Sequence, residues 1–137
     1  MDKDIINAWD NAQQKLRYYL RTNAQSGYDS YEELLKLSLS FMFSKDDYGM
    51  PSSDLITKID NGDYQGTLVF VIGGYGYQPG VDDHWYTSVG YGSCSGCDTL
   101  QSINSYEEGL PSEEQVNGYW TLCLHMIQKM RRMKDDD

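Results

Sequence analysis

The chain has 137 residues, of which 39% are hydrophobic and 23% charged, and its formal net charge is −10. This length and apolar content fit one folded domain, residues 1–137, and exclude intrinsic disorder, a collagen-like repeat and a disulfide-dense mini-protein. The negative charge disfavours direct binding to nucleic acid, and the longest apolar run, Leu68 to Ile72, is far shorter than the ~20 residues that span a bilayer.

Apolar residues recur every three or four positions in two N-terminal segments, which predicts two helices. The first helix is expected from Asp4 to Asn23. The second begins after a capping box formed by Ser30 and Glu33, and the short connection between the two favours an antiparallel helical hairpin. The stretch that follows, Ser44 to Ser53, is rich in Gly, Pro, Ser and Asp and predicts a loop.

The pattern then changes to that of β-strands. Three segments, Leu55 to Ile59, Gly66 to Ile72 and His84 to Tyr91, predict a three-stranded antiparallel meander. Both faces of the second segment are apolar, so we expect this strand to be central and covered on both sides. Strict alternation in the third segment places Trp85 on one face of the sheet and His84 on the other.

The last third of the chain predicts two further helices. A Gly/Ser loop from Gly92 to Asp98 leads into a short helix that begins near Thr99. A second capping box, Ser112 with Gln115, opens a long helix that runs to about Met133. The expected fold is therefore α+β: a helical hairpin, a three-stranded antiparallel sheet, then a short and a long helix packed on the sheet.

The strongest local motif is the loop Gly92-Ser93-Cys94-Ser95-Gly96-Cys97-Asp98. Two thiols separated by two residues at a helix N-terminus suit a redox switch, because the helix dipole favours the thiolate. The same pair is half of a zinc site. The Gly and Ser residues could instead point successive backbone amides at a small anion. The plainest interpretation is a tight strand-to-helix turn in which the thiols fill space.

A zinc site would need two more ligands. Cys123 and His125 are two positions apart on a predicted helix, which turns their side chains ~200° from each other. Cys123 falls on the apolar stripe and is expected in the core, with His125 facing away. The set of Cys94, Cys97, Cys123 and His84 is geometrically possible. We nevertheless expect no metal and no cofactor, and no catalytic residue is assigned.

The negative charge is concentrated in the middle of the chain. From Ser44 to Leu110 there are ten acidic and two basic residues, a net charge of −8. Such a segment attracts a basic protein surface, mimics nucleic acid, or simply keeps the protein soluble. Tyr75 and Tyr77 lie in a Gly-rich loop, and we do not expect both of them to be buried. Exposed aromatic side chains beside carboxylates are typical anchors of protein interfaces. The candidate interface comprises Asp60, Asp63, Tyr75, Tyr77, Asp82 and Asp83.

Four stretches of the sequence carry a resemblance to a known family. They are Asp60 to Thr67, Tyr77 to Pro79, Tyr91 to Gln101 and Leu122 to His125. They resemble a family of small, uncharacterised proteins of bacteriophages and prophages. The similarity covers roughly Ile59 to Met130, outside the first two helices, and the family supplies no activity or catalytic residues. The resemblance implies an accessory phage protein that is expressed in a host bacterial cytoplasm and is aimed at a host protein.

These observations favour a binding protein over an enzyme. The expected function is that of a small acidic phage protein that engages a host protein with a basic surface, and the specific hypothesis is inhibition of a nucleic-acid-handling defence enzyme. The alternatives are a thiol or zinc site at Cys94 and Cys97 used for redox sensing or catalysis, and a small-anion-binding module at the same loop. Neither a membrane nor nucleic acid is an expected partner, and three cysteines without a secretory signal favour a reducing cytoplasm.

Overall fold

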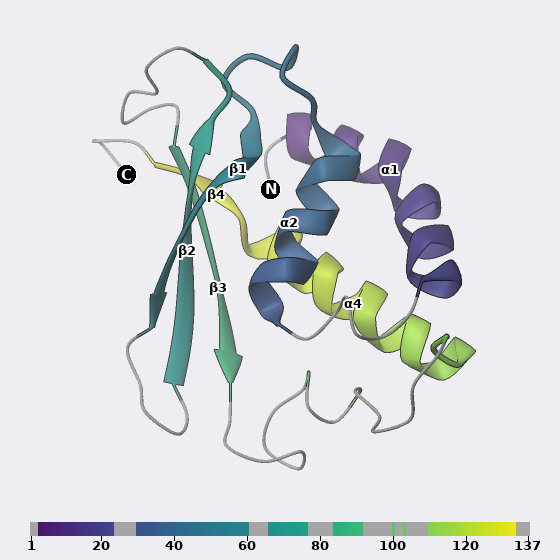
Figure 1. Cartoon of the computed structure of the whole chain (residues 1–137). Helices are drawn as coiled ribbons and strands as arrows, with labels where there is room; N and C mark the ends of the chain where they lie inside the picture. The colour runs from purple at the N-terminus through teal and green to yellow at the C-terminus, as the bar shows by residue number, and fades with distance from the viewer. Residues whose placement is uncertain are drawn as a thin grey trace.

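The computed structural model describes residues 3–23, 30–60, 66–76, 84–91, 100, 103 and 110–133. Its elements in chain order are α1 (Lys3–Thr22), α2 (Tyr31–Met42), β1 (Pro51–Asp60), β2 (Gly66–Gly74), β3 (His84–Tyr91), α4 (Glu113–Lys129) and β4 (Arg131–Arg132). The strands form one antiparallel sheet in the order β1-β2-β3-β4, and the labelled helices gather on one side of it (Figure 1). The predicted α+β class is confirmed.

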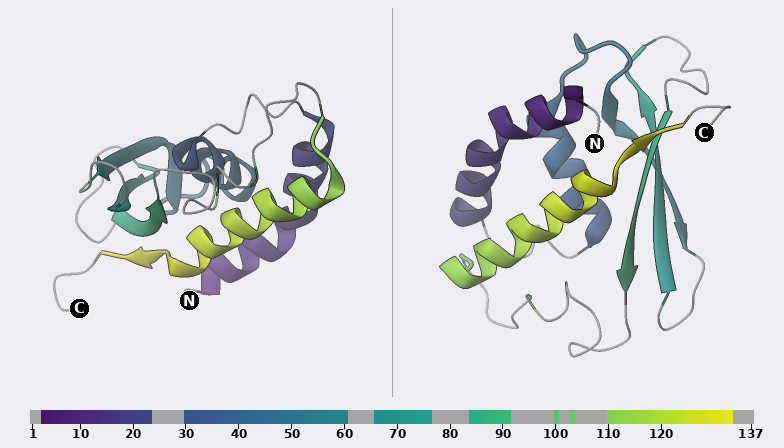
Figure 2. Two further views of the ribbon diagram at one scale, coloured as in Figure 1. Left: turned by 90° about the horizontal axis from the view of Figure 1, so that it is seen from below. Right: turned by 180° about the vertical axis from the view of Figure 1, so that it is seen from behind.

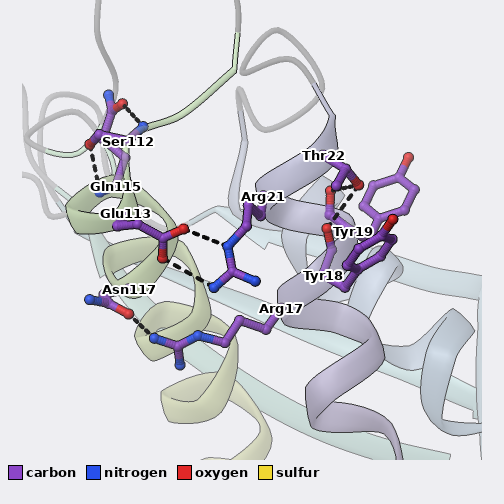
Figure 3. A network of polar contacts seen from close by, with 9 residues as sticks. All are labelled: Arg17, Tyr18, Tyr19, Arg21, Thr22, Ser112, Glu113, Gln115 and Asn117. Atoms are coloured by element: carbon purple, nitrogen blue, oxygen red, sulfur yellow. Dashed lines mark hydrogen bonds and ion pairs between the residues drawn. The ribbon is translucent and has the colours of Figure 1, made fainter.

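Both serines that were predicted to cap helices do so. The Ser30 hydroxyl oxygen accepts a hydrogen bond from the amide of Glu33 at the start of α2. Ser112 does the same for the amide of Gln115 at the start of α4, and the Gln115 side chain accepts a bond from the Ser112 amide in return (Figure 3). These bonds satisfy amides that the first turn of a helix leaves without partners, which explains why both helices begin where the sequence predicts.

The α1 helix packs its apolar stripe against the other two helices. Its buried residues are Ile5, Trp9, Ala12, Leu16 and Leu20. The helices α2 and α4 lie between α1 and the sheet (Figures 1 and 2). The rings of Trp9 and Trp120 meet with their centroids 5.6 Å apart. Because α4 contacts both α1 and α2, the expected helical hairpin is part of a three-helix cluster rather than a separate unit.

Polar contacts join α1 to α4 along their exposed side. The Arg21 guanidinium forms an ion pair with the Glu113 carboxylate, and Arg17 donates a hydrogen bond to Asn117 (Figure 3). The Arg17 guanidinium also lies 5.3 Å from the centre of the Trp120 ring. The hydrogen bond and charge of Arg21 lower the pKa of Glu113. Because both partners are exposed, the pair fixes geometry more than it adds stability.

The first strand begins earlier than expected. Pro51 pairs with Gly74, although Ser44 to Ser53 was predicted to be a loop. The pairing then breaks, and resumes where Ile56 pairs with Ile72. The extra residues on β1 form a bulge opposite Gly73, and this bulge accommodates the Ser and Asp residues that otherwise disfavour a strand.

A fourth strand corrects the predicted three-stranded sheet and the predicted end of the last helix. The α4 helix ends at Lys129, not near Met133, and Arg131 and Arg132 pair with Tyr86 and Trp85 of β3. The Met133 amide donates to the His84 carbonyl, which extends this pairing. The backbone groups of Arg131, Arg132 and Met133 thus form hydrogen bonds with the edge of β3 instead of with a further turn of helix.

Coverage of the sheet also differs from expectation. The β2 strand is interior, as predicted, and Phe70 and Ile72 are fully buried on the face that meets the helices. Val69 and Val71, on the opposite face, are only partly buried. In the part of the chain that the structure describes, no helix or strand covers this second face, so the expectation that both sides are covered is wrong there.

The predicted short helix near Thr99 and the turn between the first two strands fall mainly outside the described residues. Leu100, which is described, is buried, and its amide donates to the Tyr31 hydroxyl of α2. Ile103 lies against Gly118 of α4, where an added Cβ would come within 2.9 Å of it. Leu100 and Ile103 therefore pack on the helical cluster.

Candidate protein-binding surface

Much of the predicted loop site lies outside the described residues. This applies to Gly92, Ser93, Cys94, Ser95, Gly96, Cys97 and Asp98, and to Asp63, Tyr77, Asp82 and Asp83 of the predicted interface. That the two loop thiols are reduced and metal-free therefore stays a prediction, which stoichiometric zinc or a reversible disulfide in the purified protein would contradict.

The structure separates the two remaining ligands of the hypothetical zinc set. Cys123 is fully buried on α4, with its sulfur 3.8 Å from the Leu34 carbonyl oxygen of α2. Burial raises the pKa of this thiol to about 12, which keeps it neutral. His84 belongs to the opposite face of the sheet, so the sheet lies between the two side chains. Among the described residues, no three His, Cys, Asp or Glu side chains gather as a metal site.

Two members of the predicted interface, Tyr75 and Asp60, lie within the described residues. Tyr75 is partly buried against the core, and its backbone bonds to Met50 and Gly49. Tyr75 is thus tied to the segment before β1, and its side chain is partly exposed. Asp60 is exposed at the end of β1, opposite Leu68 of β2.

The surface that the structure does present is the sheet face turned away from the helices (Figures 1 and 2). We call this the outer sheet face. Register and alternation assign it Leu55, Thr57, Ile59, Val69, Val71, Gly73, His84, Tyr86 and Ser88. Leu55, Ile59 and Tyr86 are 45%, 49% and 43% exposed, and they lie around the partly buried Val69 and Val71. Exposed apolar side chains gathered on one face are typical of a binding surface.

One end of the outer sheet face is hollowed. The hollow has a volume of about 450 Å³. It is lined by Asp54, Leu55, Ile56, Thr57, Val71, Gly73 and His84. Gly73 leaves room for the Leu55 side chain, because a Cβ at position 73 would lie 3.1 Å from Leu55 Cδ1. The bulge in β1 therefore positions Leu55 and Asp54 beside this hollow.

The free edge of β1 is protected against strand addition. Lys58 and Asp60 place charges on this edge, and the bulge interrupts its regular geometry. Charged side chains and bulges are devices that keep edge strands from pairing with another chain. A partner is thus more readily accommodated on the outer sheet face than along the β1 edge.

A second hollow lies among the helices. It has a volume of about 460 Å³ and is lined by Gln14, Lys15, Tyr18, Tyr19 and Phe41. Tyr18 is 66% exposed, and the rings of Tyr19 and Phe41 meet edge to face. This hollow lies on the helical side of the molecule, and it provides matched control positions for experiments on the outer sheet face.

Comparison with protein families, with curated proteins and with solved structures finds no match for this chain. None of the described helices combines the length and apolar character that crossing a membrane requires.

Proposed function

We propose that this chain is a phage-encoded binding protein that engages a basic surface of a host protein through the outer sheet face. The observation that carries the proposal is the exposure of Leu55, Ile59 and Tyr86 on a sheet face that no described helix or strand covers. Apolar and aromatic side chains of this kind supply most of the energy of protein interfaces. The resemblance of Ile59 to Met130 to phage proteins supports the proposed origin.

The charge of the protein supports a basic partner. The net charge of −10 attracts a cationic surface and repels a second copy of the same chain. Asp54 is exposed on β1 and lines the hollow of the outer sheet face, whereas Arg131 is exposed beside Tyr86 at the β4 side. The basic groups of the partner are thus expected opposite β1. Enzymes that handle nucleic acid carry such surfaces, and occupying one would block its substrate.

Affinity capture from bacterial lysate tests the proposal. The bait is the wild-type chain or the double variant Leu55→Asn with Tyr86→Ser, and Tyr18→Ser on α1 is the matched control that also removes an exposed apolar side chain. The double variant is expected to lose at least ~30-fold in affinity for a captured partner, because interface anchors contribute about 2 kcal/mol or more. The control is expected to bind like wild type.

Salt adds a second test. Capture is expected to be faster and stronger at low salt, since the Debye length falls from about 10 Å at 0.1 M to about 3 Å at 1 M. Circular dichroism of each bait checks that the domain stays folded. The proposal is wrong if the double variant keeps the same partners as wild type, or if no partner is captured at any salt concentration.

A further inference from the structure

The hollow among the helices, which we name the aromatic hollow, is lined from two elements. Gln14, Lys15, Tyr18 and Tyr19 come from α1 and Phe41 comes from α2, and the lining surface is almost entirely apolar. Its volume of about 460 Å³ falls within the range of ~300–1,000 Å³ that is usual for small-molecule sites, which are mostly apolar and aromatic. The size and the lining therefore fit a small ligand with a flat apolar part.

The two tyrosines of this hollow do not belong to the buried apolar stripe of α1. Tyr18 is 66% exposed and Tyr19 is 37% exposed, and both rings lie on the side of α1 away from Arg17 and Arg21 (Figure 3). The Tyr19 ring meets the Phe41 ring edge to face, with centroids 5.6 Å apart, and this contact holds one wall of the hollow. Aromatic rings that the core does not use are available to contact the ring of a ligand.

The charge near the aromatic hollow is opposite in sign to that of the whole chain. Residues 11–22 of α1 and 34–42 of α2 hold four basic residues and no acidic residue, although the net charge of the chain is −10. Lys15 is exposed, and its methylene groups belong to the apolar lining, so its ammonium lies within a few bonds of the hollow. This ammonium forms no ion pair with any described residue. A ring with a carboxylate beside it would therefore meet a cation, whereas a cationic ring would be repelled.

We propose that the aromatic hollow binds a small aromatic carboxylate, a property that is independent of the outer sheet face. The ring of the ligand lies against Tyr18 and Phe41, and its carboxylate accepts a hydrogen bond from the Lys15 ammonium at the mouth of the hollow. Aromatic pairs in offset or edge-to-face contact contribute beyond the burial of their area. An aromatic lining also suits an organic cation, but Lys15 disfavours one here. The site thus selects the sign of the charge as well as the ring.

A titration with four matched probes tests the proposal. Indole-3-acetate is added to the isotope-labelled full chain, and the amide resonances of Lys15, Tyr18 and Phe41 are followed. Indole-3-acetamide keeps the ring without the charge, tryptamine reverses the charge, and cyclohexylacetate keeps the charge without an aromatic ring. We expect saturable shifts with indole-3-acetate, with a dissociation constant on the order of 1 mM. The other three probes are expected to bind at least about threefold more weakly.

Matched variants locate the site. Lys15→Gln is expected to weaken indole-3-acetate about threefold and to leave indole-3-acetamide unchanged, whereas Lys129→Gln, an equal loss of charge at an exposed lysine of α4, changes neither. Tyr18→Ser is expected to weaken both probes at least ~3-fold, because it removes an aromatic wall of the hollow. Tyr18→Phe keeps the ring, and Tyr86→Ser removes an exposed tyrosine from the outer sheet face instead, so both are expected to bind like wild type.

Each outcome decides for or against the site. Absent or diffuse shifts with indole-3-acetate, equal binding of any of the other three probes, or unchanged binding by Lys15→Gln or Tyr18→Ser would overturn it. Saturable shifts that depend on the ring, on the carboxylate and on both side chains would establish it. Partner capture through the outer sheet face is measured separately, so either proposal can fail while the other stands.

Discussion

Replacing Thr87 by valine is expected to destabilise the fold by about 1–2 kcal/mol. Thr87 is buried on β3, and its hydroxyl donates a 2.6 Å hydrogen bond to the Met126 carbonyl near the end of α4. The amide of Met130 bonds the Ile127 carbonyl instead, so the threonine supplies the hydrogen bond at the Met126 carbonyl. Leaving a buried carbonyl without a donor costs about 1–3 kcal/mol, and the extra methyl of valine recovers at most ~0.8 kcal/mol.

Chemical denaturation and thermal unfolding measure this effect. For a chain of this length, a loss of about 1–2 kcal/mol corresponds to a fall in Tm of roughly 4–7 °C. Thr87→Ser is the control, since it keeps the hydroxyl and loses only a methyl group. The carbon-13 resonance of the Met126 carbonyl is expected to move in the valine variant and to stay in place in the serine variant. Wild-type stability of Thr87→Val together with an unchanged Met126 resonance would refute the reasoning.

Three further predictions concern the helices. Ser112→Ala is expected to cost about 1 kcal/mol in denaturant unfolding, because α4 loses its capping box. Arg21→Gln is expected to return the pKa of Glu113 toward its ordinary 4.5 in an NMR titration. The free energy of unfolding is expected to change little, because the ion pair is exposed. In wild type, the small stabilisation by this ion pair is present above pH 4.5 and is lost as the pH falls through the lowered pKa of Glu113. Burial raises the pKa of the Cys123 thiol from its ordinary 9.0 to about 12, so stability that is complete below pH 9 is expected to fall toward pH 12. Equal slopes of unfolding free energy against pH for wild type and Cys123→Ala would contradict this last prediction.

Local patterns made most of the fold predictable. Ser30 and Ser112 mark helix starts because a cap depends on residues only three positions apart. Alternation along β3 correctly separates the buried Trp85 and Thr87 from the exposed Tyr86. The α4 end could not be predicted in the same way, because the bonds that stop the helix come from β3, which lies about 40 residues earlier in the chain.

The candidate protein-binding surface was less predictable, for a physical reason. Apolar residues on both faces of β2, such as Val71, indicate that both faces avoid water, but the pattern does not tell whether a helix of the same chain or a partner covers them. Leu55 was visible as an apolar residue, yet its place beside Gly73 depends on the bulge in β1.

The contact between α1 and α4 has a consequence for the order of folding. Arg21 and Glu113 are 92 positions apart, and Arg17 and Asn117 are 100 apart. The strands β1, β2 and β3 pair with their neighbours in the chain and need only short loops to close. The entropic cost of closing a loop grows with its length. The three-stranded meander can therefore form before α1 packs against α4. During synthesis on a ribosome, the part of the α1 apolar stripe that packs against α4 would therefore stay open to solvent or to a chaperone until the last quarter of the chain has emerged.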